Sequence, residues 1–255
     1  MTFVFSPLQQ FDILPFFDLY FFGIDFSFTN ETIMFALIFG IFFLAVFSSY
    51  LLENATLVLT PYRVQILLET VYKLIMSLIN DNIGSQKGQA FFPLLVCTFL
   101  FLISLNAVGL IPYTFTLTSH LIVTLTFSSF LFLGVTILCI SIHGCRFFSL
   151  FLPSGASIVL SLLLVPIELM SYVFKPISLS IRLFANMMAG HTLLKVIVGF
   201  AWNLLACTGL LVLITFVPLL ILLPLFALEI GVAMIQSFVF TILITIYIND
   251  ALNLH

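Results

Sequence analysis

The sequence predicts an all-α membrane protein with about five membrane helices and one interfacial amphipathic helix. Composition is the first reason: 63% of the 255 residues are hydrophobic and 7% are charged, whereas soluble domains are about 45–50% apolar and about 25% charged. The second reason is the length of the uncharged runs, because about 20 apolar residues in a helix cross the hydrocarbon core. Helices are required because backbone groups in lipid find no water to bond.

Composition also excludes several functions. The net charge of −3 is small and implies no nucleic-acid partner. The sequence has no GxxxxGK, GxGxxG or HExxH motif, so nucleotide or zinc-hydrolase chemistry is not expected on this chain and no cofactor is predicted. The cysteines form no CxxC pair and mostly lie in apolar runs, so we interpret them as small core residues rather than disulfides or metal ligands. They are Cys97, Cys139, Cys145 and Cys207.

The chain begins with an apolar segment, residues 1–30, that is interrupted by Pro7 and Pro15 and contains no Lys or Arg. It also carries three aspartates, and we predict an irregular N-terminal segment there. Residues 32–52 then contain no charge, so a first membrane span is predicted over 31–52. The whole of 31–255 is predicted to form a single membrane domain.

Residues 61–83 are predicted to form a helix on the membrane surface. Thr60-Pro61 is typical of an N-cap followed by proline in the first helical turn. Apolar residues then recur at helical spacing: Val64, Leu67, Leu68, Val71, Leu74, Ile75 and Leu78. The charged residues of this stretch lie off the apolar stripe, which favours a helix that lies on the membrane rather than one that crosses it.

The remaining spans form two pairs. Residues 90–142 predict a helical hairpin with spans over 91–112 and 121–142. Residues 157–250 contain two runs of about 40 residues each, which as helices are roughly 60 Å long, against a hydrocarbon core of about 30 Å. Either each run breaks at its prolines or both helices are steeply tilted, and the sequence leaves this open. The prolines are Pro166, Pro176, Pro218 and Pro224.

Charge bias orients these spans. The loops at 53–90 and 143–156 carry Lys and Arg residues, whereas residues 1–30 carry none. The positive-inside rule therefore places both loops on the inner face and the N-terminus outside. Five crossings return the C-terminus to the inside.

Polar residues form a continuous stripe along each of the two long runs. In the first run they are spaced three, four or seven residues apart, which keeps them on one helix face: Ser161, Glu168, Ser171, Lys175, Ser178, Arg182 and Asn186. In the second run the stripe consists of Glu229, Gln236 and Asp250. If the runs form an antiparallel hairpin that turns near Gly209, three pairs lie at equal depth: His191 with Glu229, Arg182 with Gln236, and Glu168 with Asp250.

This arrangement suggests two proton paths that do not meet. The orientation places Glu168 and Asp250 toward the inner face and His191 and Glu229 toward the outer face, with Arg182 between them. Histidine and carboxylate side chains take up and release protons, whereas arginine does not release its proton at any relevant pH. An arginine at the bilayer centre costs between about 2.5 and 17 kcal/mol, which indicates a functional role.

Two other interpretations remain open at this point. The stripes could be polar contacts that hold two packed helices together, which explains the serines better than the arginine. His191 and Glu229 could bind zinc, but two ligands without a cysteine or a second histidine form a weak site, and no metal is predicted. We assign no role to His120, His143 or His255.

The segment Ser180-Ile-Arg182-Leu-Phe-Ala-Asn186-Met-Met-Ala-Gly-His191 resembles the signature of subunit a of F-type ATP synthase. The resemblance runs from about residue 85 to the C-terminus and more loosely over the rest. The pairing of His191 with Glu229 resembles the mitochondrial and alphaproteobacterial versions, since many other bacterial members carry these two residue types exchanged. Further matching stretches are Phe91 to Leu94, Asn106 to Tyr113, Pro166 to Glu168, Glu229 to Gln236 and Tyr247 to Ala251.

In that family the subunit holds two offset aqueous half-channels beside a rotating c-ring, and the last two helices pack against the ring as a strongly tilted antiparallel hairpin. The resemblance implies that Arg182, Asn186 and Gln236 face the c-ring. It implies that His191 and Glu229 line a half-channel on the intermembrane-space side, and that Glu168 and Asp250 line one on the matrix side.

The resemblance also implies a location and a set of partners. The location is the mitochondrial inner membrane, with a bacterial plasma membrane as the alternative. The partners are the c-ring, peripheral-stalk subunit b, other membrane-sector subunits and membrane lipid. The chain would be the proton-channel subunit of a proton-transporting ATP synthase, with ATP made on other subunits.

Two rival functions explain the sequence less well. A proton-coupled secondary transporter usually shows two related halves with broken helices at matching positions, and the sequence shows no such repeat. A structural subunit without transport activity has no use for an arginine between separated acids.

Overall fold

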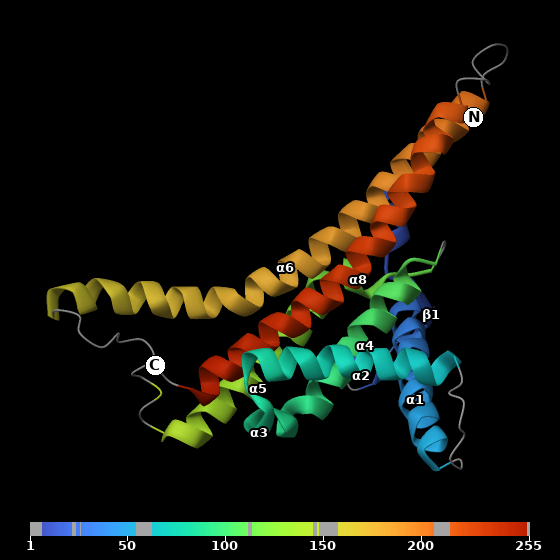
Figure 1. Ribbon diagram of the computed structural model, residues 1–255. Coiled ribbons are helices and arrows are strands. Elements are labelled where there is room, and N and C mark those ends of the chain that lie inside the picture. Colours follow the sequence, from blue (N-terminus) through green and yellow to red (C-terminus); the bar gives the residue numbers. More distant parts are fainter. Residues whose placement is uncertain are drawn as a thin grey trace. The chain divides into compact units, whose positions relative to one another are not determined.

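The computed structural model describes residues 7–21, 24–25, 27–54, 63–111, 114–144, 147, 158–206 and 215–253. Helices dominate these residues (Figure 1). Within the described ranges, four helical segments are long and apolar enough to cross a membrane: Gln89–Gly109, Leu121–His143, Leu163–Leu205 and Phe216–Leu252. The stretch Asn30–Leu44 is a shorter apolar helix. The predicted class, an all-α membrane protein, is confirmed.

The N-terminal segment has more regular structure than the sequence predicted. A 3-10 helix, η1, covers Pro7–Phe11. Strand β1 (Pro15–Phe17) pairs antiparallel with β4 (Phe28–Thr29), and β2 (Tyr20–Phe21) pairs antiparallel with β3 (Ile24–Asp25). These strands are two or three residues long, too short for alternation to be visible in the sequence.

Helix α1 (Asn30–Asn54) covers the predicted first span. Its first residue, Asn30, ties the preceding segment to the helix. The Asn30 amide donates to the carbonyl of Asp12 at 3.1 Å, and its side-chain oxygen accepts the backbone N–H of Leu14 at 3.2 Å. The same oxygen accepts the N–H of Glu31 at 3.0 Å, so one side chain also bonds an amide of the first helical turn.

Helix α2 (Arg63–Asn82) corresponds to the predicted surface helix, although Thr60 and Pro61 lie outside the described residues. Ile75 and Ile79 are fully buried, whereas Leu67 is 60% exposed. The apolar stripe is therefore divided between the protein core and an outward-facing surface, as expected for a helix that contacts lipid. On its polar side Lys73 pairs with Glu69 at 2.9 Å, one helical turn apart.

The two central spans are α4 (Phe92–Gly109) and α5 (Leu121–His143). Short helices precede α4: α3 (Ser85–Gly88) and η2 (Gln89–Phe91). The connection to α5 contains η3 (Leu117–Ser119), whose three residues are all buried. Both spans were predicted from their uncharged length, and both are found within three residues of the predicted bounds.

The last third of the chain forms two long helices, α6 (Ile158–Leu205) and α8 (Phe216–Leu252). The helical assignment runs without interruption through Pro166, Pro176 and Pro224. The sequence left two alternatives open for these runs, a break at the prolines or a steep tilt. A break in the helix is not observed at these three prolines. With 48 and 37 residues, these helices are about 72 and 56 Å long. Helices of this length fit a hydrocarbon core of about 30 Å only when tilted or projecting beyond it.

The packing divides the chain into two compact units, each assembled from three separate stretches. Unit 1 comprises Met1–Leu44, Phe101–His120 and Leu183–Ser237. Unit 2 comprises Ala45–Leu100, Leu121–Arg182 and Phe238–His255. Each unit therefore contains one part of α6 and one part of α8. We describe the two units separately.

Within unit 2, side-chain hydroxyls tie α5 to α6. Thr124 and Ser180 are both buried and their hydroxyl oxygens lie 3.2 Å apart. One turn further along α5, the hydroxyl of Ser128 donates to the carbonyl of Pro176 at 3.0 Å. In an apolar environment such paired hydroxyls hold helices together without unsatisfied polar groups.

Within unit 1, α4 is tied to α8 through Asn106. This residue is 1% exposed, and its amide donates to the carbonyl of Ala233 at 3.2 Å. The end of α4 also lies close to α6, because a Cβ at Gly109 would be 3.4 Å from the terminal methyl group of Met187. Through these contacts α4 meets both α6 and α8 within unit 1.

Candidate functional site

A titratable pair joins α6 and α8 in unit 1. The Nε2 atom of His191 lies 3.6 Å from Oε1 of Glu229, and the two side chains are 15% and 6% exposed. The two residues, predicted to pair across the hairpin, are therefore in contact. Gly190 permits this approach, because a Cβ at that position would lie 2.7 Å from the same Glu229 oxygen.

Glu229 also lines a cavity of about 240 Å³. Its polar walls come from three helices and its apolar walls mainly from leucines: Asn106, Asn186, Met187, Ala189, Gly190, Leu193, Leu194, Leu225, Leu228, Glu229, Val232, Ala233 and Gln236. We call this the Glu229 cavity. His191 contacts Glu229 but does not line the cavity.

Polar atoms without hydrogen-bond partners gather at the Glu229 cavity. Among the described residues, neither carboxylate oxygen of Glu229 has a hydrogen bond, and the same holds for Oδ1 of Asn106 and Nε2 of Gln236. Buried polar atoms are costly to leave unbonded, and polar cavities of this size hold ordered water. A cavity of about 240 Å³ has room for several water molecules. The geometry is that of a largely apolar pocket whose wall carries one carboxylate and three amide side chains.

The amides of Asn186 and Gln236 are joined in the same cavity. Nδ2 of Asn186 donates to Oε1 of Gln236 at 3.0 Å, and Gln236 is 5% exposed. The sequence analysis paired Gln236 with Arg182, one turn earlier on α6. Within unit 1 the hydrogen-bond partner of Gln236 is Asn186.

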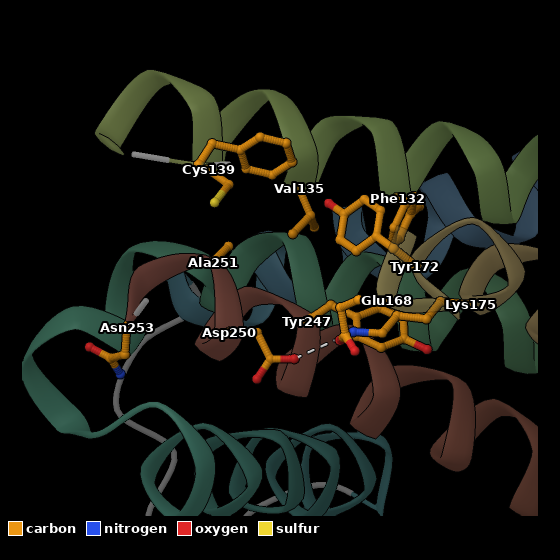
Figure 2. Close-up of a pocket in the computed structure, with 11 residues that line it drawn as sticks. Phe132, Val135, Cys139, Glu168, Tyr172, Lys175, Tyr247, Asp250, Ala251 and Asn253 are labelled. Carbon is orange, nitrogen blue, oxygen red and sulfur yellow. Dashed lines mark ion pairs between the residues drawn. The ribbon is translucent and has the colours of Figure 1, made fainter. Parts of the chain in front are cut away.

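Unit 2 contains a second cavity, of about 180 Å³, between α5, α6 and α8 (Figure 2). It has two carboxylates, one ammonium group and an aromatic wall: Phe132, Val135, Cys139, Phe147, Glu168, Tyr172, Lys175, Tyr247, Asp250, Ala251 and Asn253. We call this the Asp250 cavity. Glu168 and Asp250, which the sequence analysis placed at equal depth, line the same cavity.

Lys175 is the cation of the Asp250 cavity. Its Nζ lies 3.7 Å from Oδ2 of Asp250, the ion pair drawn as a dashed line in Figure 2. The same nitrogen lies over two aromatic faces, 4.9 Å from the ring centroid of Tyr247 and 5.6 Å from that of Tyr172. Both distances are within the range of a cation–π contact. The pair is partly exposed, at 31% for Lys175 and 47% for Asp250.

In the sequence of α6, Arg182 lies between the residues that line the Asp250 cavity and those that line the Glu229 cavity. Its side chain is exposed, and among the described residues it makes no ion pair or hydrogen bond. Within unit 2 its charge acts on the phenol of Tyr247, but a phenol is neutral at physiological pH and does not balance a cation. Among the residues that the structure describes, the guanidinium therefore has no compensating charge.

Several secondary assignments can now be checked. Cys139 is buried, as expected, but Cys97 is exposed, because it lies on the outer face of α4. Cys145 and Cys207 lie outside the described residues. Among the residues that are described, no group of three His, Cys, Asp or Glu could hold a metal ion.

Two of the remaining histidines have structural contacts. His120 stacks on Phe115 with ring centroids 5.1 Å apart. His143 lies 3.0 Å from the carbonyl of Ala251, a contact between the last residue of α5 and the end of α8. His255 lies outside the described residues.

The polar stripe on α6 has two kinds of members. The hydroxyls of Ser171 and Ser178 bond to carbonyls of their own helix, three residues earlier. Glu168 and Lys175 instead line the Asp250 cavity. The side chain of Ser161 lies outside the described part of the chain.

Sequence reasoning missed three residues of the site. Asn106 was quoted only within a matching stretch, although a single amide in an otherwise apolar span is a visible signal. Lys175 was placed on the stripe without a role. The position of Gly190 against Glu229 had no signal of its own, because close approach of two helices depends on their packing.

The fold and the two cavities define a class: a multi-pass helical membrane protein with protonatable residues in two separate polar cavities and an uncompensated arginine. A sequence model of the ATP synthase A chain family matches residues 32–249. Subunit a of ATP synthase from the brown alga Pylaiella littoralis is 49% identical over 255 residues, covering 98% of this chain and 99% of its own.

Two further relatives agree with this result. Subunit a from Marchantia polymorpha is 45% identical, covering 98% of this chain and 99% of its own, and subunit a from Chondrus crispus is 43% identical, covering 98% and 97%. The chain belongs to the ATP synthase subunit a family, the proton-translocating subunit of the synthase membrane sector. A proton-coupled secondary transporter is not favoured, and other ATP synthase subunits are its partners.

Proposed function

We propose that the two cavities are the two half-channels of a proton path that is completed by a neighbouring c-ring. The Glu229 cavity, with His191 beside it, delivers protons from the intermembrane space. The Asp250 cavity, with Glu168, releases them toward the matrix. No continuous path within this subunit is needed, because the proton travels between the cavities on the ring.

The observation that carries this proposal is the uncompensated charge of Arg182. A guanidinium on a membrane helix is costly, so such residues pair with other groups. Among the described residues this chain offers Arg182 no carboxylate. A carboxylate of a c subunit supplies the missing partner, and an arginine attracts that carboxylate in its ionised form without being able to pass on a proton.

Asn186 and Gln236 assist at the same face. Their hydrogen bond fixes two amide groups in the Glu229 cavity, and Asn186 lies one helical turn after Arg182 in the sequence of α6. Amides donate and accept hydrogen bonds without titrating. They can therefore hold water and the ring carboxylate in place while leaving proton transfer to Glu229.

In this proposal the two half-channels open to opposite sides of the membrane, and the membrane potential supplies the driving force. Moving one proton across the membrane potential releases about 2.3 kcal/mol per 100 mV. The ring carboxylate binds its proton from one cavity and loses it to the other, so the flow turns the ring in one direction. The chain needs no nucleotide site, because ATP is formed on other subunits.

We also propose a location and neighbours. The location is the mitochondrial inner membrane, which is supported by the His191 and Glu229 pair because it resembles the mitochondrial versions of the family. Its neighbours there are the c-ring, subunit b of the peripheral stalk and lipid. The exposed apolar side chains of α5 and α8, such as Ile122 at 79% and Leu220 at 77%, suit lipid or membrane-subunit contact.

The test is the variant Arg182→Ala in the assembled synthase. Inner-membrane vesicles would be energised with an imposed pH difference and potential, and ATP synthesis and ATP-driven proton pumping would be measured. We expect both to be lost while native electrophoresis shows a complete complex. The control is Lys195→Ala on the same helix, because Lys195 lines neither cavity. Normal coupling in the Arg182→Ala complex would overturn the proposal.

A further inference from the structure

We propose that the two acids of the Asp250 cavity have different tasks: Asp250 is a fixed anion held by Lys175, and Glu168 is the acid that exchanges protons. This inference rests on the proposed function of the cavity as the matrix half-channel. It assigns Lys175 as a positioning residue, one that acts through Asp250 rather than on the proton itself.

The first half of the inference, that Lys175 holds Asp250 as a fixed anion, rests on the surroundings of Lys175. Its ammonium group lies over the faces of two tyrosine rings, one from α6 and one from α8, and within 3.7 Å of Asp250. Aromatic faces attract a cation but do not neutralise its charge. Asp250 is the only carboxylate within ion-pairing distance of it among the described residues.

The second half, that Glu168 is the acid that exchanges protons, rests on the surroundings of Glu168. It lines the same cavity as Lys175 and Asp250, yet within the described part of the chain its carboxylate has no ion pair. Its side chain is exposed, and the neighbouring Ser171 hydroxyl bonds only to the Glu168 backbone carbonyl. A carboxylate in this position gains and loses a proton without breaking an ion pair.

The charges around the cavity support this division. The charged groups on its walls are Glu168 and Lys175 from α6 and Asp250 from α8. Tyr172 and Tyr247 contribute neutral phenols, and α5 contributes apolar side chains and the thiol of Cys139. One cation and one anion cancel, which leaves a single acid to carry net charge. Removing one partner of an ion pair is disruptive, because the other partner is left uncompensated.

The pairing can therefore be tested with a double-mutant comparison inside one cavity. Lys175→Met and Asp250→Asn would be made singly and together in the complete synthase, and the rate of ATP-driven proton pumping measured per assembled complex. We expect each single variant to lower the rate by at least about threefold, and the double variant to recover to within about twofold of the unaltered enzyme.

Glu168 supplies the matched comparison. Glu168→Gln is expected to stop pumping, and adding Lys175→Met is expected to give no recovery, because Glu168 is not the partner of Lys175. Lys175→Arg keeps the cation and should retain most of the rate. If Lys175 had only a structural role, recovery of the Lys175→Met variant would not depend on whether Asp250 or Glu168 is neutralised.

The outcomes separate the inference from the proposed function. If Glu168→Gln stops pumping but the double variant Lys175→Met/Asp250→Asn is no faster than the single variants, the assignment of Lys175 is overturned and the half-channel stands. If Asp250→Asn alone stops pumping and nothing restores it, Asp250 is itself a proton carrier and the division of tasks is wrong. If neither acid is needed, the proposed function of this cavity falls as well.

Discussion

His191 on α6 and Glu229 on α8 face each other across the helical hairpin, with Nε2 and Oε1 separated by 3.6 Å. Both side chains are largely buried, and the Glu229 carboxylate also reaches the wall of a polar cavity. The separation is too long for a good hydrogen bond but short enough for an ion pair when the imidazole is protonated. Glu229 is thus in contact with a titratable neighbour on one side and a space for water on the other.

This relationship predicts that Glu229→Gln impairs proton flow. The amide has the same shape but cannot take up and release a proton, and loss of a positioned acid or base commonly costs about 100-fold or more. We expect ATP synthesis in energised vesicles to fall by at least that factor in an assembled complex. Glu69→Gln on α2, an exposed acid paired only with Lys73, is the control and should be near normal. Equal activity of the two variants would contradict the assignment of Glu229.

Gly190 provides a steric test of the same contact. A Cβ there would lie 2.7 Å from Oε1 of Glu229 and 3.1 Å from its carboxyl carbon, so Gly190→Ala must displace the carboxylate. Because that oxygen is the end of a flexible side chain, the carboxylate can move aside while the helices stay packed. We expect reduced ATP-driven pumping without loss of the subunit from the complex. Gly199→Ala, on the same helix with nothing within 4 Å of the added carbon, should pump normally. Similar rates for the two variants would show that the contact with Glu229 does not matter.

The role of Arg182 can be tested by moving the arginine from position 182 to position 236. Arg182→Gln is expected to abolish coupled ATP synthesis, because the ring carboxylate loses its counter-charge. Adding Gln236→Arg is expected to restore part of it, since Gln236 bonds to Asn186, one turn from Arg182 on α6. The measurement is ATP synthesis in vesicles that carry the double variant, with Gln236→Arg alone as the control. No recovery in a fully assembled complex would count against a shared ring-facing position.

Much of the helical framework could be predicted because each signal is local. The spans over 90–142 depend only on uncharged length, and they are found as α4 and α5. The stripe on α6 follows from helical periodicity alone. The N-terminal strands could not be predicted in this way, because strands of two or three residues pair with partners that periodicity does not identify.

Pairing across the hairpin was predicted in part. His191 and Glu229 lie together, and Glu168 and Asp250 line one cavity. The bonds of Gln236 to Asn186 and of Asp250 to Lys175 did not follow from the register. The single register used for the prediction assumes two straight helices that stay at a constant angle. Helices that cross, and that carry internal prolines, change their facing residues by a turn along their length.

The sequence by itself determined the class of protein, the spans and the identity of the charged residues, because hydrophobic length and helical period act over neighbouring residues. Only the tertiary structure decided which of those residues share a cavity. It placed Asn106 and Glu229 around one space and Lys175 and Asp250 around another. The physical reason is that contact between helices depends on how closely and at what angle they pack, as the absence of a Cβ at Gly190 illustrates.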